Sequence, residues 1–406
     1  MHKTIKTGKE WPVNFLTGRS IVHKFFTTVV IAAATLVGTS QYAFAETKVG
    51  LLLPRSGTYA VLGKEIEAGF NLAVEQADRT GEFKIFNEDT EIKPQVGLAK
   101  ARKLVLENEV DVIVGIVSSG VLGAIRDFMH NAKVPLIVAN AGNNEATGKS
   151  CSPYITRVSF SSNQLNRPIG KWMFDKGIRK VYTLAPDYVA GHQMIDGFTD
   201  AFTRAGGEVV GREFTPFGKT KDFGPYLAKA KAAKPDAIFV FYAGGEAISF
   251  VKQYGSFGLS KELPLYSSGF LTSPLYVKAE GDAAIGIVAS LHYVPTLDTP
   301  ENKEFVEAFI AKEGRSPSEY AVQGYDAAKL LMGAADAGAN DRASLAEQLP
   351  KVKYVSPRGP VEIDLATNNI IQNVYVYDTV TNGGELTQKI LDTLEAVQDA
   401  PNGCTM

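Results

Sequence analysis

Two adjacent serines follow one of the most apolar stretches of this 406-residue chain, and they suggest anion binding. The run 110–117 (VDVIVGIV) predicts a buried strand, and Ser118 and Ser119 open a segment with helical spacing. Hydroxyls and free backbone N–H groups at the start of a helix can bind a carboxylate. Helix capping explains the same residues, because serine is favoured at that position. The pair therefore predicts either an anion site or an ordinary cap.

A second polar loop follows the next predicted strand, 134–138. It comprises Asn140, Ala141, Gly142 and Asn143, and all four are candidates for contacting a ligand. The Asn143 side chain either reaches the ligand or stabilises a turn, since asparagine tolerates left-handed backbone geometry.

The loop after the first apolar run, 49–53, carries Arg55 and Tyr59. A guanidinium fork suits a carboxylate, although an arginine on a loop is commonly solvated. Tyr59 either stacks on a ligand or packs within its own lobe. We keep both residues as candidate ligand contacts.

Later loops supply the opposite side of the expected site. Its candidates are Tyr188, His192, Ala243, Gly244, Gly269 and Phe270. Small residues at 243–245 would let the backbone approach a ligand closely. His192 could hydrogen-bond a ligand hydroxyl through a ring nitrogen. Tyr242 ends a predicted buried strand and is explained equally well as a core residue.

Catalytic, metal and nucleic-acid sites are not indicated. His130, His192 and His292 are scattered, and neither GxSxG nor GxGxxG occurs in the expected place. Two cysteines without a CxxC motif predict no metal or redox centre. A net charge of −2 argues against a nucleic-acid partner. We expect a non-enzyme without a cofactor.

Strands and helices alternate along most of the chain, as in a parallel sheet covered by helices. We also expect a strand at 92–96, with its proline tolerated at a sheet edge. The tail differs, because 361–364 and 374–377 alternate like antiparallel strands. The sequence thus predicts an α/β protein with two doubly wound lobes.

The N-terminus has the features of an export signal. Basic residues precede the apolar stretch 25–37, and Ala43-Phe44-Ala45 is an A-x-A cleavage pattern. Residues 1–45 are therefore predicted to be a cleaved signal peptide, with an uncleaved membrane anchor as the other reading. Cys151 and Cys404 are expected to pair after export, the alternative being two free thiols.

The chain resembles the type I periplasmic solute-binding proteins of ABC transporters, in the branched-chain amino-acid (Leu/Ile/Val) binding family. The resemblance rests on the order of several segments: KVGLLLPRSGTYAVLG, VDVIVGIVSSG, PLIVANAGNNEATG, DYVAGH, KDFGPYLAKAKAAKPDAIFVFYAGGEA and HYVPTLDTPENKEF. It implies two lobes joined by three crossovers that close on a ligand. The first lobe would comprise 47–160 plus 293–372, and the second 161–292 plus 373–406.

The resemblance also implies roles for individual residues. A serine matching Ser119 binds the ligand carboxylate, the loop near Asn140 and Gly142 contributes further contacts, and a tyrosine near Tyr188 covers the ligand. Amino-acid binders place a glutamate near 267–270 for the ligand ammonium, where this chain has Ser268, Gly269 and Phe270. A buried ammonium without a carboxylate partner is costly.

This departure favours an aromatic acid, such as a benzoate or phenylpropanoid, over an α-amino acid. Glu246 nearby leaves an amino acid or amide open as the alternative. The implied partners are the permease subunits of an ABC importer, reached from the periplasm by a monomeric protein. A ligand-sensing receptor subunit is the rival function.

Overall fold

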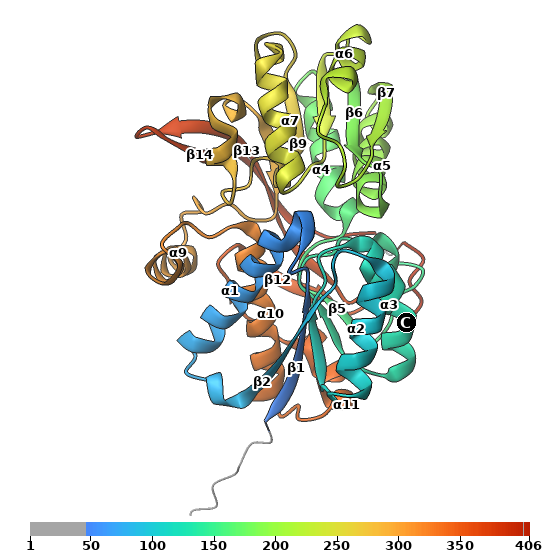
Figure 1. Cartoon of the computed structure of the whole chain (residues 1–406), viewed down its shortest axis with the longest axis vertical. Coiled ribbons are helices and arrows are strands. Elements are labelled where there is room, and N and C mark those ends of the chain that lie inside the picture. Colours follow the sequence, from blue (N-terminus) through green and yellow to red (C-terminus); the bar gives the residue numbers. More distant parts are fainter. Residues whose placement is uncertain (1–45, 401) are drawn as a thin grey trace, which may run out of the picture. The chain divides into compact units, whose positions relative to one another are not determined.

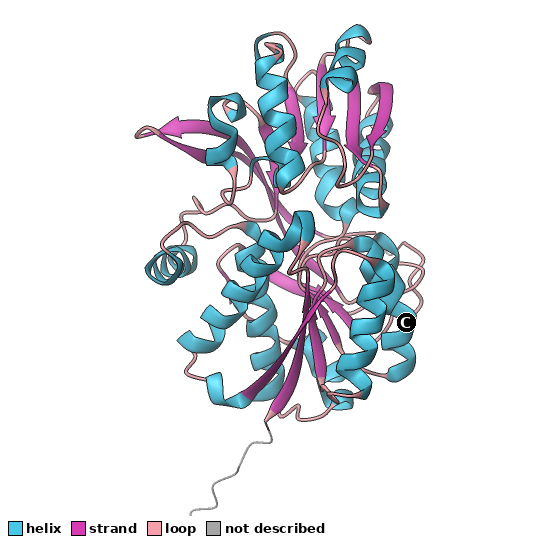
Figure 2. Cartoon of the chain, viewed as in Figure 1, coloured by secondary structure: helices cyan, strands magenta, loops and turns pink. Residues whose placement is uncertain are grey.

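Short apolar runs buried on both faces form the central strands of the protein. The computed structural model describes residues 46–400 and 402–406, which form one 14-stranded sheet with helices on its faces (Figure 2). The strands are β1 (Thr47–Leu53), β2 (Phe83–Asp89), β3 (Val112–Gly115), β4 (Leu136–Val138), β5 (Ile155–Arg157), β6 (Lys180–Pro186), β7 (Glu208–Thr215), β8 (Ala237–Val240), β9 (Leu265–Ser268), β10 (Val288–Leu291), β11 (Val355–Ser356), β12 (Gly359–Asp364), β13 (Asn369–Asn382) and β14 (Glu385–Val397).

Two parallel groups make up most of this sheet. The first strand group runs in the order β2-β1-β3-β4-β5, and the second strand group in the order β10-β9-β8-β6-β7. Helices connect most successive strands of each group, so the predicted α/β class is confirmed. The α-helices are α1 (Ala60–Gln76), α2 (Pro94–Leu106), α3 (Ser119–Ala132), α4 (Ser162–Asp175), α5 (Val189–Arg204), α6 (Gly224–Ala232), α7 (Gly245–Ser256), α8 (Val277–Glu280), α9 (Pro300–Glu313), α10 (Glu319–Asp336) and α11 (Arg342–Gln348).

The long strand β13 joins the two groups (Figure 1). Its first residue pairs with β5 in parallel, and its residues 375–378 pair antiparallel with β10. The chain also passes from one group to the other between β5 and α4, and again between β10 and α9. The chain therefore crosses three times between the groups.

Helices α1 and α10 pack closely because glycines meet backbone at their crossing. A β-carbon on Gly69 would overlap the carbonyl of Ala321, and one on Gly324 would overlap the carbonyl of Ile66. This close approach sets the first turns of α10 against the middle of α1.

The expected strand at 92–96 is wrong. Pro94 instead is the first residue of α2. Backbone N–H groups in the first turn of a helix have no hydrogen-bond partner within it, so proline, which lacks this group, is tolerated there. The second strand is β2, at the edge of the sheet, where several side chains are only partly covered. Its polar residues (FKIFNED) give it a weaker apolar signal than a central strand.

The tail forms antiparallel strands, as predicted. Val361 pairs with Gln372 between β12 and β13, while β14, which we did not predict, pairs with β13. Cys151 and Cys404 form a disulfide with their Cα atoms 5.5 Å apart, which confirms the expected pairing.

The predicted signal peptide lies outside the described residues. Within the described ranges, no helix combines the length and apolar character needed to cross a bilayer.

Candidate functional site

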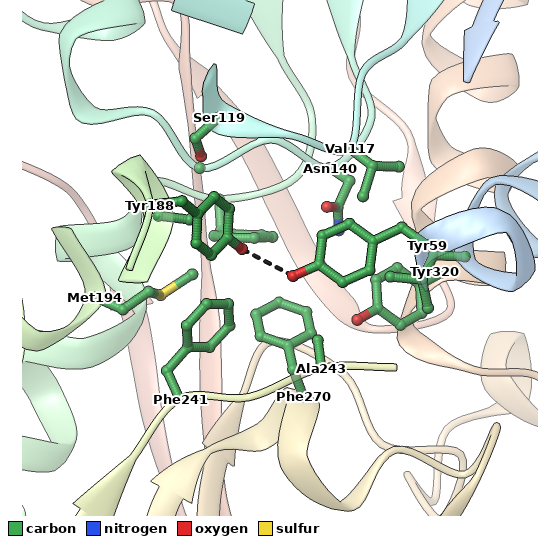
Figure 3. A pocket seen from close by; sticks show the side chains of 14 residues that line it. Tyr59, Val117, Ser119, Asn140, Tyr188, Met194, Phe241, Ala243, Phe270 and Tyr320 are labelled. Atoms are coloured by element: carbon green, nitrogen blue, oxygen red, sulfur yellow. Dashed lines mark hydrogen bonds between the residues drawn. The ribbon is translucent and has the colours of Figure 1, made fainter. Parts of the chain in front are cut away.

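A cavity lies where the two strand groups face each other (Figure 3), and the space in and around its mouth, including the part open to solvent, is about 310 Å³. The lining residues are Tyr59, Leu62, Val117, Ser119, Asn140, Gly142, Phe160, Tyr188, Ala190, Met194, Phe241, Ala243, Phe270 and Tyr320.

Most of these residues lie just beyond the carboxyl ends of parallel strands. Val117 follows β3, Asn140 follows β4 and Phe160 follows β5, while Phe241 follows β8 and Phe270 follows β9. Open α/β sheets bind ligands at this edge. The cavity thus receives loops from both strand groups.

Ser119 supplies an unused hydrogen-bonding group to the cavity. It is the first residue of α3, its side chain is buried, and its Oγ has no hydrogen-bond partner among the described residues. The N-terminus of α3 adds unpaired backbone donors and a favourable dipole for an anion. A ligand carboxylate would satisfy both the hydroxyl and the helix terminus.

The wall beside Ser119 is fixed by a buried polar chain. Asn140 donates its side-chain N–H to Oε1 of Gln323 (2.8 Å), and Gln323 in turn donates to Nε2 of His292 (3.0 Å). Burial lowers the pKa of His292 well below its usual value, so the ring is neutral and able to accept. This chain holds Asn140 in place and leaves no positive charge on the histidine.

Tyr59 and Tyr188 bridge the cavity from opposite sides (Figure 3). Their hydroxyls lie 2.9 Å apart, and Tyr188 stacks on Phe217 with ring centroids separated by 4.1 Å. Burial raises the pKa of both phenols, so both stay neutral donors. The pair links the two strand groups directly across the site.

Replacing Tyr188 by Phe should weaken ligand binding about fivefold, because one buried hydrogen bond contributes about 1 kcal/mol. Tyr59→Phe should give the same loss by calorimetry. In the double variant the losses should not add, since both changes remove one bond. Additive losses would show that each hydroxyl acts separately.

Aromatic rings form the rest of the wall. The Phe270 ring lies 5.2 Å from Phe160, 5.7 Å from Tyr320 and 6.0 Å from Phe241, measured between centroids. Such tilted and edge-to-face arrangements are favourable for aromatic pairs. A flat apolar ligand body could be enclosed by these rings.

No acidic or basic side chain lines the cavity among the residues that the structure describes. Glu246, the acid that might compensate an ammonium, accepts a hydrogen bond from the backbone N–H of Gly218 (2.9 Å) and lies outside the lining. Burial raises the pKa of Glu246 to about 7. The cavity therefore contains nothing that would neutralise a buried ammonium.

The structure brings seven of the candidate ligand contacts to the cavity wall. These are Tyr59, Ser119, Asn140, Gly142, Tyr188, Ala243 and Phe270. The other seven, which do not line it, are Arg55, Ser118, Ala141, Asn143, His192, Gly244 and Gly269.

Arg55 and His192 are held away from the cavity by their own partners. Arg55 pairs with Glu67 (2.8 Å) and donates to Asn87, while His192 contacts Asp187 at 2.8 Å. Glu67 lies on α1, whereas Asp187 lies only five residues before His192, directly after β6.

Asn143 and Gly244 have structural contacts instead. The Asn143 side chain accepts from Glu145 N–H and donates to the Ser119 carbonyl, so it stabilises the turn. Gly244 approaches the carbonyl oxygen of Thr58 in the opposite part of the molecule. Tyr242 is a core residue that stacks on Phe250.

Seven lining residues were not among the candidates: Leu62, Val117, Phe160, Ala190, Met194, Phe241 and Tyr320. Phe160 and Phe241 follow strands, so the rule that selected Ser119 would also have found them. Met194 and Tyr320 lie on helices, where no local pattern distinguishes a cavity residue from a core residue.

We expect Ser119→Ala to weaken aromatic-acid binding about 10- to 100-fold, the effect of losing a hydrogen bond to a charged group. The ligand-free variant should be at least as stable as the wild type, because an unpartnered buried hydroxyl is removed. Ser118→Ala, the adjacent serine outside the lining, is the matched control. Equal losses in both variants, measured by calorimetry, would contradict the role of Ser119.

Comparison with known proteins agrees with this geometry. A family model described as periplasmic binding protein matches residues 46–385. The "Leu/Ile/Val-binding protein homolog 6" of Brucella melitensis biotype 1 is 32% identical over 381 residues, which are 91% of this chain and 96% of the relative.

Two solved ABC-transporter solute-binding proteins are also similar. One from R. palustris, in complex with benzoate, has 36% identity and a TM-score of 0.84, covering 89% of this chain and 100% of that chain. Another, from Rhodopseudomonas palustris BisB5 in complex with 3,4-dihydroxy benzoic acid, has 34% identity and a TM-score of 0.83, covering 87% and 98%. The resemblance and the type I fold are thereby confirmed, and the chain belongs to the periplasmic binding protein family of non-enzymatic solute-binding proteins.

Proposed function

We propose that this protein is the solute-binding component of an ABC importer and that its ligand is an aromatic carboxylic acid of the benzoate class. One observation carries the proposal: an aromatic cavity presents the unpartnered Ser119 hydroxyl and contains no charged lining residue among those described. The carboxylate would bind at the start of α3, with the ring between Phe160 and Phe270. The benzoate and dihydroxybenzoic acid complexes of its structural relatives support this choice.

A branched-chain amino acid is the second candidate, supported by the names of the Brucella relatives. Its carboxylate would fit beside Ser119 equally well. Its ammonium would face Phe270 and Phe241 without an acid, since Glu246 lies outside the lining. Desolvating an unpaired charge costs several kcal/mol, which favours the aromatic acid.

Ligand binding would close a hinge between two lobes. The lobes comprise 47–160 plus 293–372 and 161–292 plus 373–406, and the passage of β13 from one strand group to the other supports the boundary near 372. A ligand that contacts both lobes stabilises the closed form. The closed protein, a monomer freed of its signal peptide at 1–45, would dock on permease subunits in the periplasm.

A thermal-shift screen of protein beginning at Glu46, refolded to remove carried-over ligand, tests this function. The panel contains benzoate, 4-hydroxybenzoate, leucine, isoleucine and valine. A ligand at 100 times its Kd adds about 2.7 kcal/mol of stability, which is readily detected. Stabilisation by the aromatic acids is the expected result, and stabilisation by leucine alone would contradict the proposal.

A further inference from the structure

Arg157, the last residue of β5, is a fully buried arginine, and every hydrogen-bond partner of its guanidinium among the described residues is neutral. Nη1 donates to the carbonyls of Asn143 (2.7 Å) and Ala141 (3.5 Å), and Nε donates to Oδ1 of Asn369 (2.8 Å). Nη2 donates to the Thr147 hydroxyl. No carboxylate of the described residues lies within ion-pair distance of it, 4.0 Å.

The other fully buried arginine differs in this respect. Arg358 has Asp326 at 2.6 Å, so its charge is balanced locally. The acid that acts on Arg157 is Asp399, but Asp399 accepts a hydrogen bond from Ser161 and also pairs with Arg167 at 3.5 Å. Burial, only partly offset by Asp399, lowers the pKa of Arg157 to about 10. Arg167 also has Asp200 at 3.4 Å, whereas Arg157 is a buried charge with no carboxylate in direct contact among the described residues.

The guanidinium of Arg157 contacts the loop that forms part of the cavity wall near Ser119, where the ligand carboxylate would bind. Arg157 holds the backbone of the loop that contains Gly142, a lining residue. Asn143, whose carbonyl Arg157 binds, donates its side-chain N–H to the Ser119 carbonyl at 3.1 Å. Two hydrogen bonds thus connect the guanidinium to the residue whose hydroxyl faces the cavity. The effective dielectric constant of a buried region is about 20 rather than about 80, so this guanidinium is screened less than a charge at the surface.

We propose that Arg157 is the positioning residue that makes the site selective for anions. The carboxylate of the ligand balances the buried charge of Arg157 without touching it. This inference rests on the proposed function, because it assigns a cause to the carboxylate preference of the same site. It explains how a cavity without a lining cation attracts an anion.

The test compares benzoate with benzamide, a neutral ligand of the same shape, by titration calorimetry. Wild-type protein should prefer benzoate. In Arg157→Gln the preference should fall by about tenfold or more, through weaker benzoate binding with little change for benzamide. Arg157→Lys keeps the charge and should retain most of the preference. A purely structural arginine would instead weaken both ligands equally, which would overturn the proposal.

A second variant, expected to change the benzoate preference in the opposite direction, keeps the test decisive if Arg157→Gln does not fold. Asp399→Asn removes the acid that partly offsets Arg157 and should raise the benzoate preference severalfold. An unchanged preference in that variant would also overturn the inference. If the wild type binds benzoate strongly while Arg157→Gln keeps its preference, the proposed function holds and only this inference fails. If no aromatic acid binds the wild type, both fail.

Discussion

Replacing Gly244 by Ala is expected to weaken aromatic-acid binding by about a hundredfold or more. Gly244 precedes α7 with φ +60° and ψ −138°, a conformation that residues with a β-carbon rarely adopt. An added β-carbon would lie 2.9 Å from the carbonyl oxygen of Thr58. Thr58 belongs to the loop before α1, so the clash arises where the two parts of the molecule meet and opposes closure.

Gly245→Ala is the matched control for this change. Its β-carbon would have Thr58 Oγ1 at 3.9 Å as its nearest neighbour, which is an ordinary contact, and its φ is not positive. Small-angle scattering should show compaction by ligand in the wild type and in Gly245→Ala, but a larger radius in Gly244→Ala. Thermal unfolding without ligand measures the backbone strain separately. Tight binding and full compaction in Gly244→Ala would refute the close-approach argument.

Removing the Cys151–Cys404 disulfide should lower the free energy of unfolding by about 5 kcal/mol in the chain-entropy account. The two cysteines are 253 residues apart, so the bond closes a very long loop and restricts the unfolded chain strongly. The disulfide ties the tail to the segment before β5. Such a bond persists in an oxidising compartment such as the periplasm.

Urea unfolding of the Cys151→Ser/Cys404→Ser double variant measures this contribution. Reduced wild-type protein should unfold like the double variant, because neither has the cross-link. A loss below about 1 kcal/mol would mean that the unfolded chain gains little freedom when the bond is absent. If the urea midpoints of the reduced wild type and the double variant differed, the serine substitutions themselves would be changing the stability, apart from the loss of the cross-link.

The alternation of apolar runs and helical segments was enough to predict the α/β fold. Central strands such as β3 (Val112–Gly115) are buried on both faces and leave a continuous apolar signal. Edge strand β2 and hairpin strand β14 are partly exposed and polar, so periodicity does not reveal them. Pro94 is compatible with either an edge strand or a helix start, and only the packing of α2 decides between them.

The candidate site could be located from the sequence only as a set of loops. The rule that ligands bind beyond strand ends predicted Ser119, Asn140 and Phe270, which all line the cavity. It gave no information on Arg55, whose ion pair with Glu67 depends on how β1 and α1 pack. Tyr320 was missed for a similar reason, since the crossing of α1 and α10 brings it to the cavity.

A crystal structure of the protein with bound benzoate is the most direct test of the account. We predict the carboxylate within hydrogen-bond distance of Ser119 Oγ and of the backbone N–H groups that begin α3, with the ring between Phe160 and Phe270. A benzoate bound elsewhere would contradict the account. So would a copurified amino acid in the cavity with its ammonium paired to Glu246, because that carboxylate would then have to join the site.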